Sequence, residues 1–127
     1  MDYKIQEYKH HPVAVLDNDG TVIHNEQAVL DFMMEAGSDG AEAIILHEQQ
    51  LPAEFFDLST GLAGAILQKF ANYRVKLAII GSFERYQSRS LAAFMRESNR
   101  GNLIFFMPDI DTAVSCLFPE TMDKSTT

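Results

Sequence analysis

The chain has 127 residues, 46% of them hydrophobic, with nine Phe and six Met, which predicts one domain with a packed core. Its formal net charge is -8 and its pI is about 4.8, which disfavours binding to nucleic-acid phosphates or to an anionic membrane surface. The sequence holds no apolar run near the ~18 residues of a membrane-spanning helix, and its first twelve residues lack the apolar region of a secretory signal. A single cysteine, Cys116, forms no internal disulfide. We therefore expect a cytoplasmic protein with one domain over residues 1–118 and a flexible tail over residues 119–127.

Two strands are expected to open the chain as an antiparallel hairpin. Residues 3–9 alternate in polarity, which suits a half-exposed edge strand, and residues 13–16 are entirely apolar. The break between them, at His10, His11 and Pro12, is short enough for a hairpin loop.

The middle of the chain alternates helix and strand. A helix begins at an N-cap, Asn25, and ends in the glycine-containing residues 37–40. Residues 43–46 and 77–80 are short apolar runs typical of buried parallel strands, and a helix over residues 59–73 joins them as a βαβ unit. Gly61 and Gly64, near the start of this helix, indicate that its backbone closely approaches the sheet or a partner. The stripe that this helix is expected to bury consists of Leu62, Ala63, Ile66, Phe70 and Tyr73.

The last third repeats the pattern. Ser88 or Ser90 caps a helix that ends at Gly101, residues 103–107 form the last strand, and Asp109 caps a short terminal helix. The element order is therefore β-β-α-β-α-β-α-β-α. This order predicts an α/β fold with a five-stranded, mostly parallel sheet whose first strand is antiparallel. The pattern leaves open whether the helices lie on one face or on both.

The element order resembles the STAS domain of anti-sigma-factor antagonists and sulfate-transporter tails. The local likeness lies in residues 56–62, FDLSTGL, which are similar to that family's Asp-Ser-Ser-Gly-Leu turn. This sequence departs from the family turn at Leu58, at Thr60 and at Ala63. The resemblance implies that consecutive strands lie side by side with the helices on one face. It also implies that Ser59, the first serine after Asp57, is a phosphoacceptor for a partner kinase.

A second resemblance covers nearly the whole chain. The phrases FFDL (55–58), GLAG (61–64), QKF (68–70) and ESNRG (97–101) are similar to those of a small bacterial family known as domain of unknown function 4180. This resemblance implies membership of a family but no activity.

Several polar residues follow the carboxyl ends of the predicted parallel strands, where ligands of such sheets usually bind. His47 and Glu48 there suit a general base with its orienting acid, although a solvated loop histidine is the more common reading. Arg85 follows the next strand. We treat His47, Glu48 and Arg85 as candidates for a ligand or catalytic site.

Two further groups are candidates for binding. Ser59 and Thr60 suit a phosphoacceptor or an anion clamp, although helix capping explains one hydroxyl and Asp57 is able to cap instead. Polar residues crowd the end of the predicted helix, where dipole and capping effects account for Arg100 and Gly101 but not for Ser98 and Asn99. A partner-contact surface is the sharper interpretation of this second group, which consists of Glu97, Ser98, Asn99 and Arg100.

Other chemistry finds little support. The histidines His10, His11 and His24 have no ligand spacing that completes a metal site, and Cys116 has no catalytic motif beside it. The sequence contains no phosphate-binding loop, dinucleotide fingerprint or nucleophile elbow. We therefore expect no cofactor and favour a regulatory protein-interaction module over an enzyme or small-molecule binder. The protein partner is unidentified, and a homodimer is left open.

Overall fold

A five-stranded sheet forms the centre of the computed structural model, which describes residues 2–17, 20 and 23–119. The strands are β1 (Tyr3–Tyr8), β2 (His11–Leu16), β3 (Ala43–His47), β4 (Lys76–Ile80) and β5 (Ile104–Met107). The helices are α1 (Glu26–Ser38), α2 (Leu62–Tyr73), α3 (Arg89–Asn99) and α4 (Ile110–Leu117). Short 3-10 turns at Glu48–Gln50, Ala53–Phe56, Leu58–Thr60 and Phe83–Arg85 complete the described elements.

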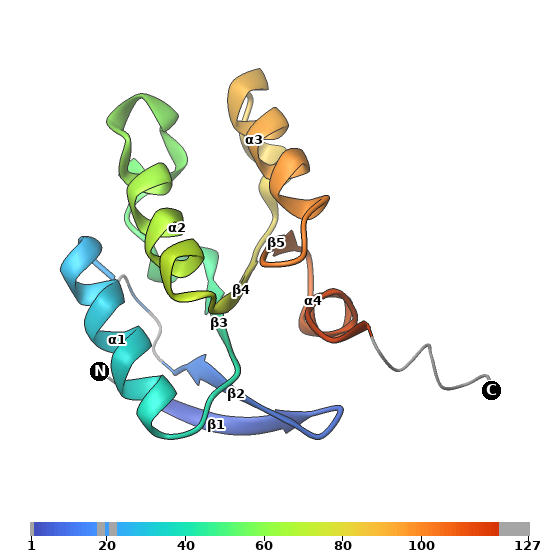
Figure 1. The fold of residues 1–127 in the computed structure, drawn as a ribbon. Coiled ribbons are helices and arrows are strands. Elements are labelled where there is room, and N and C mark those ends of the chain that lie inside the picture. Colours follow the sequence, from blue (N-terminus) through green and yellow to red (C-terminus); the bar gives the residue numbers. More distant parts are fainter. Residues whose placement is uncertain (1, 18–19, 21–22, 120–127) are drawn as a thin grey trace.

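The strands lie in the order β1-β2-β3-β4-β5, so consecutive strands are neighbours (Figure 1). β1 is antiparallel to β2, and the remaining pairs are parallel. The hairpin loop is two residues long, and Lys9 and His10 both have positive φ angles, as a type I′ turn requires. The predicted α/β fold, with an antiparallel first strand and β4 inside the sheet, is confirmed.

α1, α2 and α3 cover one face of the sheet, where Figure 1 shows them side by side. Because side chains alternate along a strand, every second strand residue points to this face. The strand residues that pack there against the three helices include Leu16, Ile44, Ile79 and Phe106.

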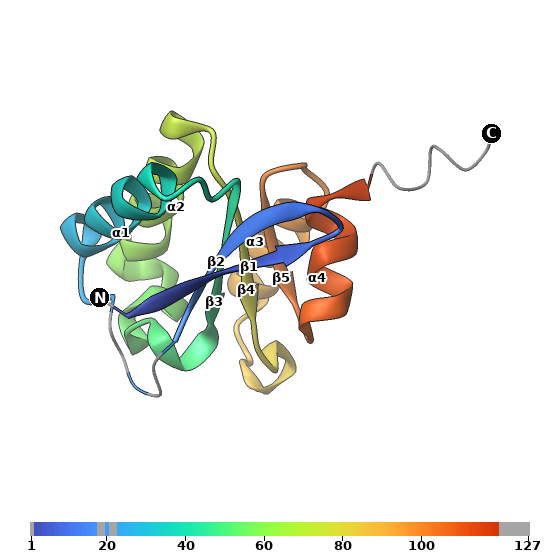
Figure 2. The same ribbon diagram turned by 90° about the horizontal axis from the view of Figure 1, so that it is seen from below.

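α4 covers the opposite face of the sheet. Figure 2 shows α1 and α2 on one side of the strands and α4 on the other. Its residues Ala113, Val114 and Leu117 pack against the remaining alternate strand residues, among them Val15, Ile45, Ala78 and Phe105. The expectation that all helices lie on one face is therefore wrong for α4. Both faces of the central strands are apolar, so the strand pattern carried no information on this choice.

The predicted buried stripe of α2 is confirmed in part. Ile66 and Phe70 are 0% exposed, as expected, whereas Tyr73 is 51% exposed and Leu67 is buried instead. The helix ends at Arg74 in a left-handed conformation, and Tyr73 lies in its last turn. Gly61 and Gly64 are both exposed, and a Cβ on either would meet nothing within 4 Å, so the expected close approach to the sheet is wrong. The approach to a partner stays a prediction.

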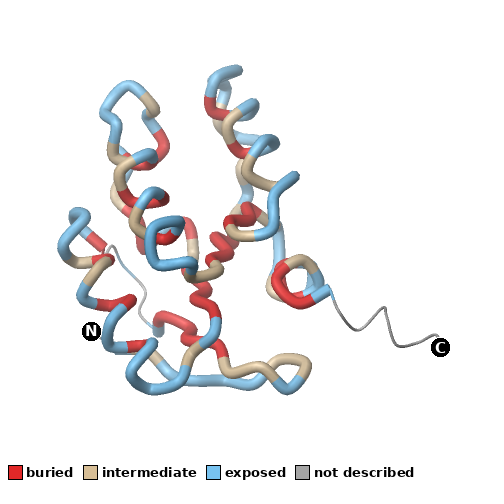
Figure 3. The backbone as a smooth tube through the Cα atoms, viewed as in Figure 1, coloured by how far each residue is buried: buried red, intermediate tan, exposed pale blue. Residues whose placement is uncertain are grey.

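Burial follows this arrangement of three layers, with the sheet between α1–α3 and α4 (Figure 3). Buried residues concentrate in β2 to β5 and on the inward sides of the helices, whereas most of β1 is exposed. The predicted tail beyond Pro119 lies outside the described residues. In the described ranges, no helix combines the length and apolar character needed to cross a membrane.

Candidate functional site

A buried carboxylate lies at the carboxyl edge of the sheet. Glu48 follows β3 directly and is only 7% exposed. Its Oε1 accepts a hydrogen bond from the Ser82 backbone N–H at 3.2 Å, and its Oε2 contacts the Tyr86 hydroxyl and the Arg85 guanidinium. The loop after β4 therefore supplies the donors and the positive charge that a buried carboxylate requires.

Gly81 makes room for this carboxylate. A Cβ built on Gly81 would lie 2.7 Å from the Cβ of Glu48, well inside van der Waals contact. The glycine that follows β4 is therefore explained by the side chain of Glu48, which follows the neighbouring strand β3.

An aromatic contact joins this loop to the segment before α2. The Tyr86 ring stacks on Phe56 with centroids 5.0 Å apart, and the Arg85 guanidinium lies 4.8 Å from the centre of the Tyr86 ring. The pKa of Tyr86 is raised to about 12. Burial is the largest cause, and the hydrogen bond to Glu48 and the negative charge of Glu48 add to it. The hydroxyl therefore remains a donor to Glu48 at neutral pH.

The structure brings Glu48 and Arg85 together but does not add His47 to them. His47 ends β3, and its backbone N–H donates to Oε1 of Gln50 at 2.8 Å. Within the described residues, no hydrogen bond joins the His47 ring to Glu48. Glu48 is thus engaged by Ser82, Arg85 and Tyr86 rather than paired with a histidine.

The turn over residues 57–61 differs in detail from a simple helix cap. α2 begins at Leu62, and Ser59 lies in the preceding 3-10 turn rather than at the N-cap. Oδ1 of Asp57 accepts from the Ser59 N–H at 3.1 Å and from the Ser59 hydroxyl at 2.6 Å. These hydrogen bonds lower the pKa of Asp57. Asp57 is therefore the capping residue of the turn, which the sequence left as an alternative.

Thr60 and Gly61 complete the turn. The Thr60 hydroxyl lies within hydrogen-bond distance of the carbonyls of Glu54 (2.8 Å) and Asp57 (2.9 Å), and it accepts from the Leu62 N–H at 3.2 Å. Gly61 has a φ of 79°, a left-handed conformation that glycine adopts without strain. Thr60 thus has a local structural role, whereas the exposed Ser59 bonds only to Asp57 among the described contacts.

The polar end of α3 divides into two kinds of residue. The side-chain amide of Asn99 bonds both the N–H and the C=O of Phe106 in β5. Arg100 and Glu97 are both exposed and form an ion pair at 3.6 Å. Ser98 is half-buried, and its carbonyl accepts from the Gly101 N–H. Asn99 therefore has a structural partner, and the exposed part of this candidate surface is reduced to Glu97 and Arg100.

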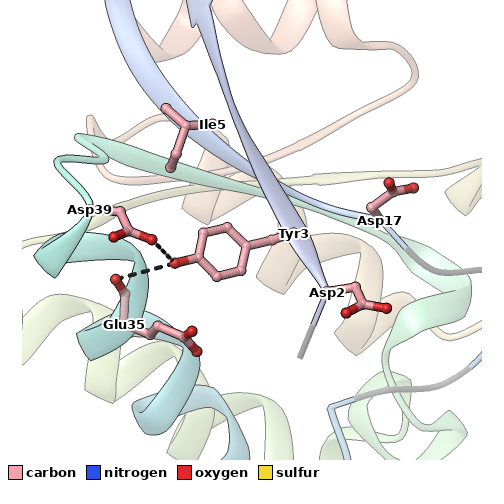
Figure 4. Close-up of a pocket in the computed structure, with 6 residues that line it drawn as sticks. All are labelled: Asp2, Tyr3, Ile5, Asp17, Glu35 and Asp39. Carbon is pink, nitrogen blue, oxygen red and sulfur yellow. Dashed lines mark hydrogen bonds between the residues drawn. The ribbon is translucent and has the colours of Figure 1, made fainter.

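The structure has an acidic hollow beside β1 that the sequence patterns did not predict. It has a volume of about 560 Å³ and lies between the start of β1, the end of β2 and α1 (Figure 4). The Tyr3 hydroxyl donates to the Asp39 carboxylate and lies 3.3 Å from the Glu35 carbonyl. The hydrogen bond to Asp39 is the main cause that raises the pKa of Tyr3 to about 12. The residues that line the hollow are Asp2, Tyr3, Ile5, Asp17, Glu35 and Asp39.

Of the histidines near the hairpin, His11 is engaged in packing, whereas His10 and His24 are exposed. The His11 ring stacks on Phe118 with centroids 4.1 Å apart, and its Nδ1 lies 2.7 Å from Glu42. Among the residues that the structure describes, no group of three or more His, Cys, Asp or Glu side chains is placed to hold a metal ion.

Comparison with family models matches residues 8–117 to the domain of unknown function DUF4180. The chain belongs to this family. No curated protein and no solved structure matches the chain. The match supports the second resemblance seen in the sequence, and the STAS-like likeness rests on the turn residues and the strand order alone.

A second hollow of this DUF4180 domain lies at the other edge of the sheet, where α3 packs beside β5. We call it the α3–β5 groove; it has a volume of about 320 Å³. Met95 and Phe106 are its buried apolar residues, and Phe83 is half-buried. Its full lining is Phe83, Glu84, Ala92, Met95, Arg96, Asn99 and Phe106. The sequence signal was the helical spacing of Ala92, Met95, Arg96 and Asn99, which places them on one stripe of α3.

Proposed function

We propose that this DUF4180 domain is a regulatory protein-interaction module that presents the turn over residues 57–61 to its partner. The observation that carries this proposal is the combination of a firmly held backbone with exposed side chains at this turn. Phe55 and Phe56, just before it, are buried, while Asp57, Ser59 and Thr60 are exposed. A turn that is ordered before binding loses little conformational entropy when a partner binds it.

We further propose that Ser59 is the switch of this surface. Transfer of the γ-phosphoryl group of a nucleoside triphosphate to Ser59 Oγ would form the O–P bond, release the nucleoside diphosphate, and release the hydroxyl proton that now bonds to Asp57. The product would place about -1.5 to -2 charge beside the Asp57 carboxylate, and the repulsion would reshape the turn. Modification would therefore change both the charge and the shape that the partner meets.

The alternative, an enzyme or small-molecule binder at the carboxyl edge, receives less support. A general base needs a carboxylate that is free to accept a proton from substrate. Both oxygens of Glu48 already contact donors from residues 82–86. We therefore assign Glu48 and Arg85 to holding the loop after β4.

The test is an affinity capture from a lysate of the source organism with tagged full-length variants. Ser59→Ala should recover the same partner as the wild type, whereas Ser59→Asp should recover markedly less. Gln68→Ala serves as the control, because Gln68 is exposed on α2 and away from the turn. Thermal melts of each variant show whether lost capture reflects unfolding. Equal recovery by Ser59→Asp and Ser59→Ala, with all variants folded, would contradict the switch.

A further inference from the structure

The α3–β5 groove combines an apolar floor with unpaired positive charge. Arg89 and Arg96 lie seven residues apart on α3, so they share a face of the helix, and Arg96 lines the groove itself. Both are exposed, and in the described part of the chain neither forms an ion pair. Arg85 and Arg100, by contrast, pair with Glu48 and Glu97.

This concentration of positive charge is unusual for this chain. Four of its five arginines fall between residues 85 and 100, although the net charge of the whole chain is -8. Glu84 is the one acidic residue in the groove lining. Arginine beside an apolar floor suits a ligand that brings carboxylates and an apolar side chain together.

We propose that the α3–β5 groove binds a short acidic peptide segment of a partner protein, with an apolar side chain on Met95 and Phe106 and carboxylates on Arg89 and Arg96. This inference deepens the proposed function, since it rests on the domain binding proteins, but it uses a surface other than the Ser59 turn. The proposal for the groove and the proposal for the turn can therefore be tested separately.

The spacing of the two arginines limits the peptide. Seven residues of α-helix span about 10 Å, and an extended chain covers about 3.3–3.6 Å per residue. Two carboxylates of an extended peptide should therefore be about three residues apart, with the apolar anchor between them.

The groove should bind the peptide through the peptide's side chains rather than by pairing with it as an added strand. β5 is an edge strand, and the Phe106 N–H and C=O are already bonded by Asn99. A strand added at this edge would have to displace that amide. This contact favours a side-chain anchor at Phe106 over main-chain pairing.

A second copy of the chain is the competing occupant, because the acidic hollow would supply its carboxylates. That contact would join the groove of one copy to the acidic hollow of the next, and these two surfaces lie at opposite edges of the sheet. Contacts between different surfaces build a ring or an open chain of copies rather than a two-fold dimer. We favour the peptide because it fills the groove without requiring such an assembly.

The first experiment selects peptides from a random library displayed on phage against the immobilised full-length protein. Enriched peptides should share an aromatic or aliphatic residue flanked by Asp or Glu. Backbone amide shifts on titration of the best peptide should cluster at Ala92, Arg96 and Phe106. Enrichment of basic or neutral peptides, failure to enrich any peptide, or shifts at other surfaces would overturn the proposal.

The second experiment uses charge reversal with the selected peptide, labelled with fluorescein. Arg96→Glu should weaken binding by roughly tenfold or more, because it turns an attraction into a repulsion. Lys4→Glu is the matched control, since Lys4 is exposed on β1 at the far edge of the sheet, and it should bind within about twofold of the wild type. Equal binding by Arg96→Glu and Lys4→Glu would overturn the proposal.

Two measurements separate the remaining outcomes. Sedimentation of the protein alone should show no assembly that Arg96→Glu abolishes; such an assembly would mean that a second copy fills the groove and that the peptide proposal is wrong. Ser59→Asp should bind the selected peptide as the wild type does. A failed switch at Ser59 would leave this peptide result unchanged, and a failed peptide result would leave the Ser59 capture result unchanged.

Discussion

The side-chain amide of Asn99 bonds both main-chain groups of Phe106. Its Oδ1 accepts from the Phe106 N–H at 2.7 Å, and its Nδ2 donates to the Phe106 C=O at 3.2 Å. The C=O groups of Leu103 and Met107 point instead to β4, where they accept from Leu77 and Gly81. The last residue of α3 thus takes the place of a sixth strand at the open edge of the sheet, where unpaired main-chain groups favour aggregation.

Asn99→Ala is expected to destabilise the domain by about 1–3 kcal/mol, because it leaves a buried-strand N–H and C=O without partners. Urea melts measure the change in the free energy of unfolding. Arg100→Ala is the neighbouring control. Arg100 is exposed and, among the described residues, forms an ion pair with exposed Glu97 alone, so its cost should stay within about 0.5 kcal/mol. Equal melts for the two variants would show that the Asn99 contact contributes little.

Gly81→Ala should destabilise the fold by about 1–3 kcal/mol, because the new methyl group would overlap the side chain of Glu48. The explanation is specific, so it predicts coupling between the two positions. In a double-mutant cycle, Gly81→Ala should cost clearly less in a Glu48→Ala background than in the wild type. Additive costs would mean that Gly81 is required for another reason.

Ile66→Ala and Phe70→Ala should each lower the free energy of unfolding by about 2–5 kcal/mol, because both side chains lie on the buried face of α2 and are fully buried. Tyr73→Ala should cost far less, although the sequence pattern placed Tyr73 on the same stripe, because its side chain is half exposed. Chemical denaturation compares the three variants. A cost at Tyr73 equal to that at Phe70 would contradict the observed end of the buried stripe.

The Tyr86 hydroxyl should lose its proton only near pH 12 in the folded protein. A folded-state pKa above the ordinary value of 10 stabilises the fold below pH 10. This contribution is lost as the pH rises from about 10 to about 12. Titration of ¹³C-labelled tyrosine rings measures the value, with Tyr86→Phe to assign the signal.

Glu48→Gln tests the cause of this shift. Removing the negative charge should move the pKa of Tyr86 downward, while burial of the ring should keep it above the ordinary value. An unchanged pKa in Glu48→Gln would mean that the contact with Glu48 has no influence on the tyrosine.

Local patterns in the sequence determined most of the fold. Apolar runs of four or five residues fixed the buried strands, the helical spacing of Ile66 and Phe70 oriented α2, and the short break near His10 predicted the antiparallel hairpin. The same patterns gave the element order, from which the neighbouring parallel strands follow. These features depend on residues close together in the chain, so periodicity and turn chemistry report them directly.

Only the tertiary structure decided the remaining features, because each depends on residues far apart in the chain. Glu48 is buried because Ser82 and Tyr86, 34 and 38 residues later, supply its donors. α4 covers the second face of the sheet. The sequence could not predict this position, because strands that are apolar on both faces do not indicate which face a helix covers. The acidic hollow likewise requires β1 to lie beside the end of α1, where Tyr3 meets Asp39 across 36 residues. No local pattern encodes such contacts, since they arise when separate elements pack together.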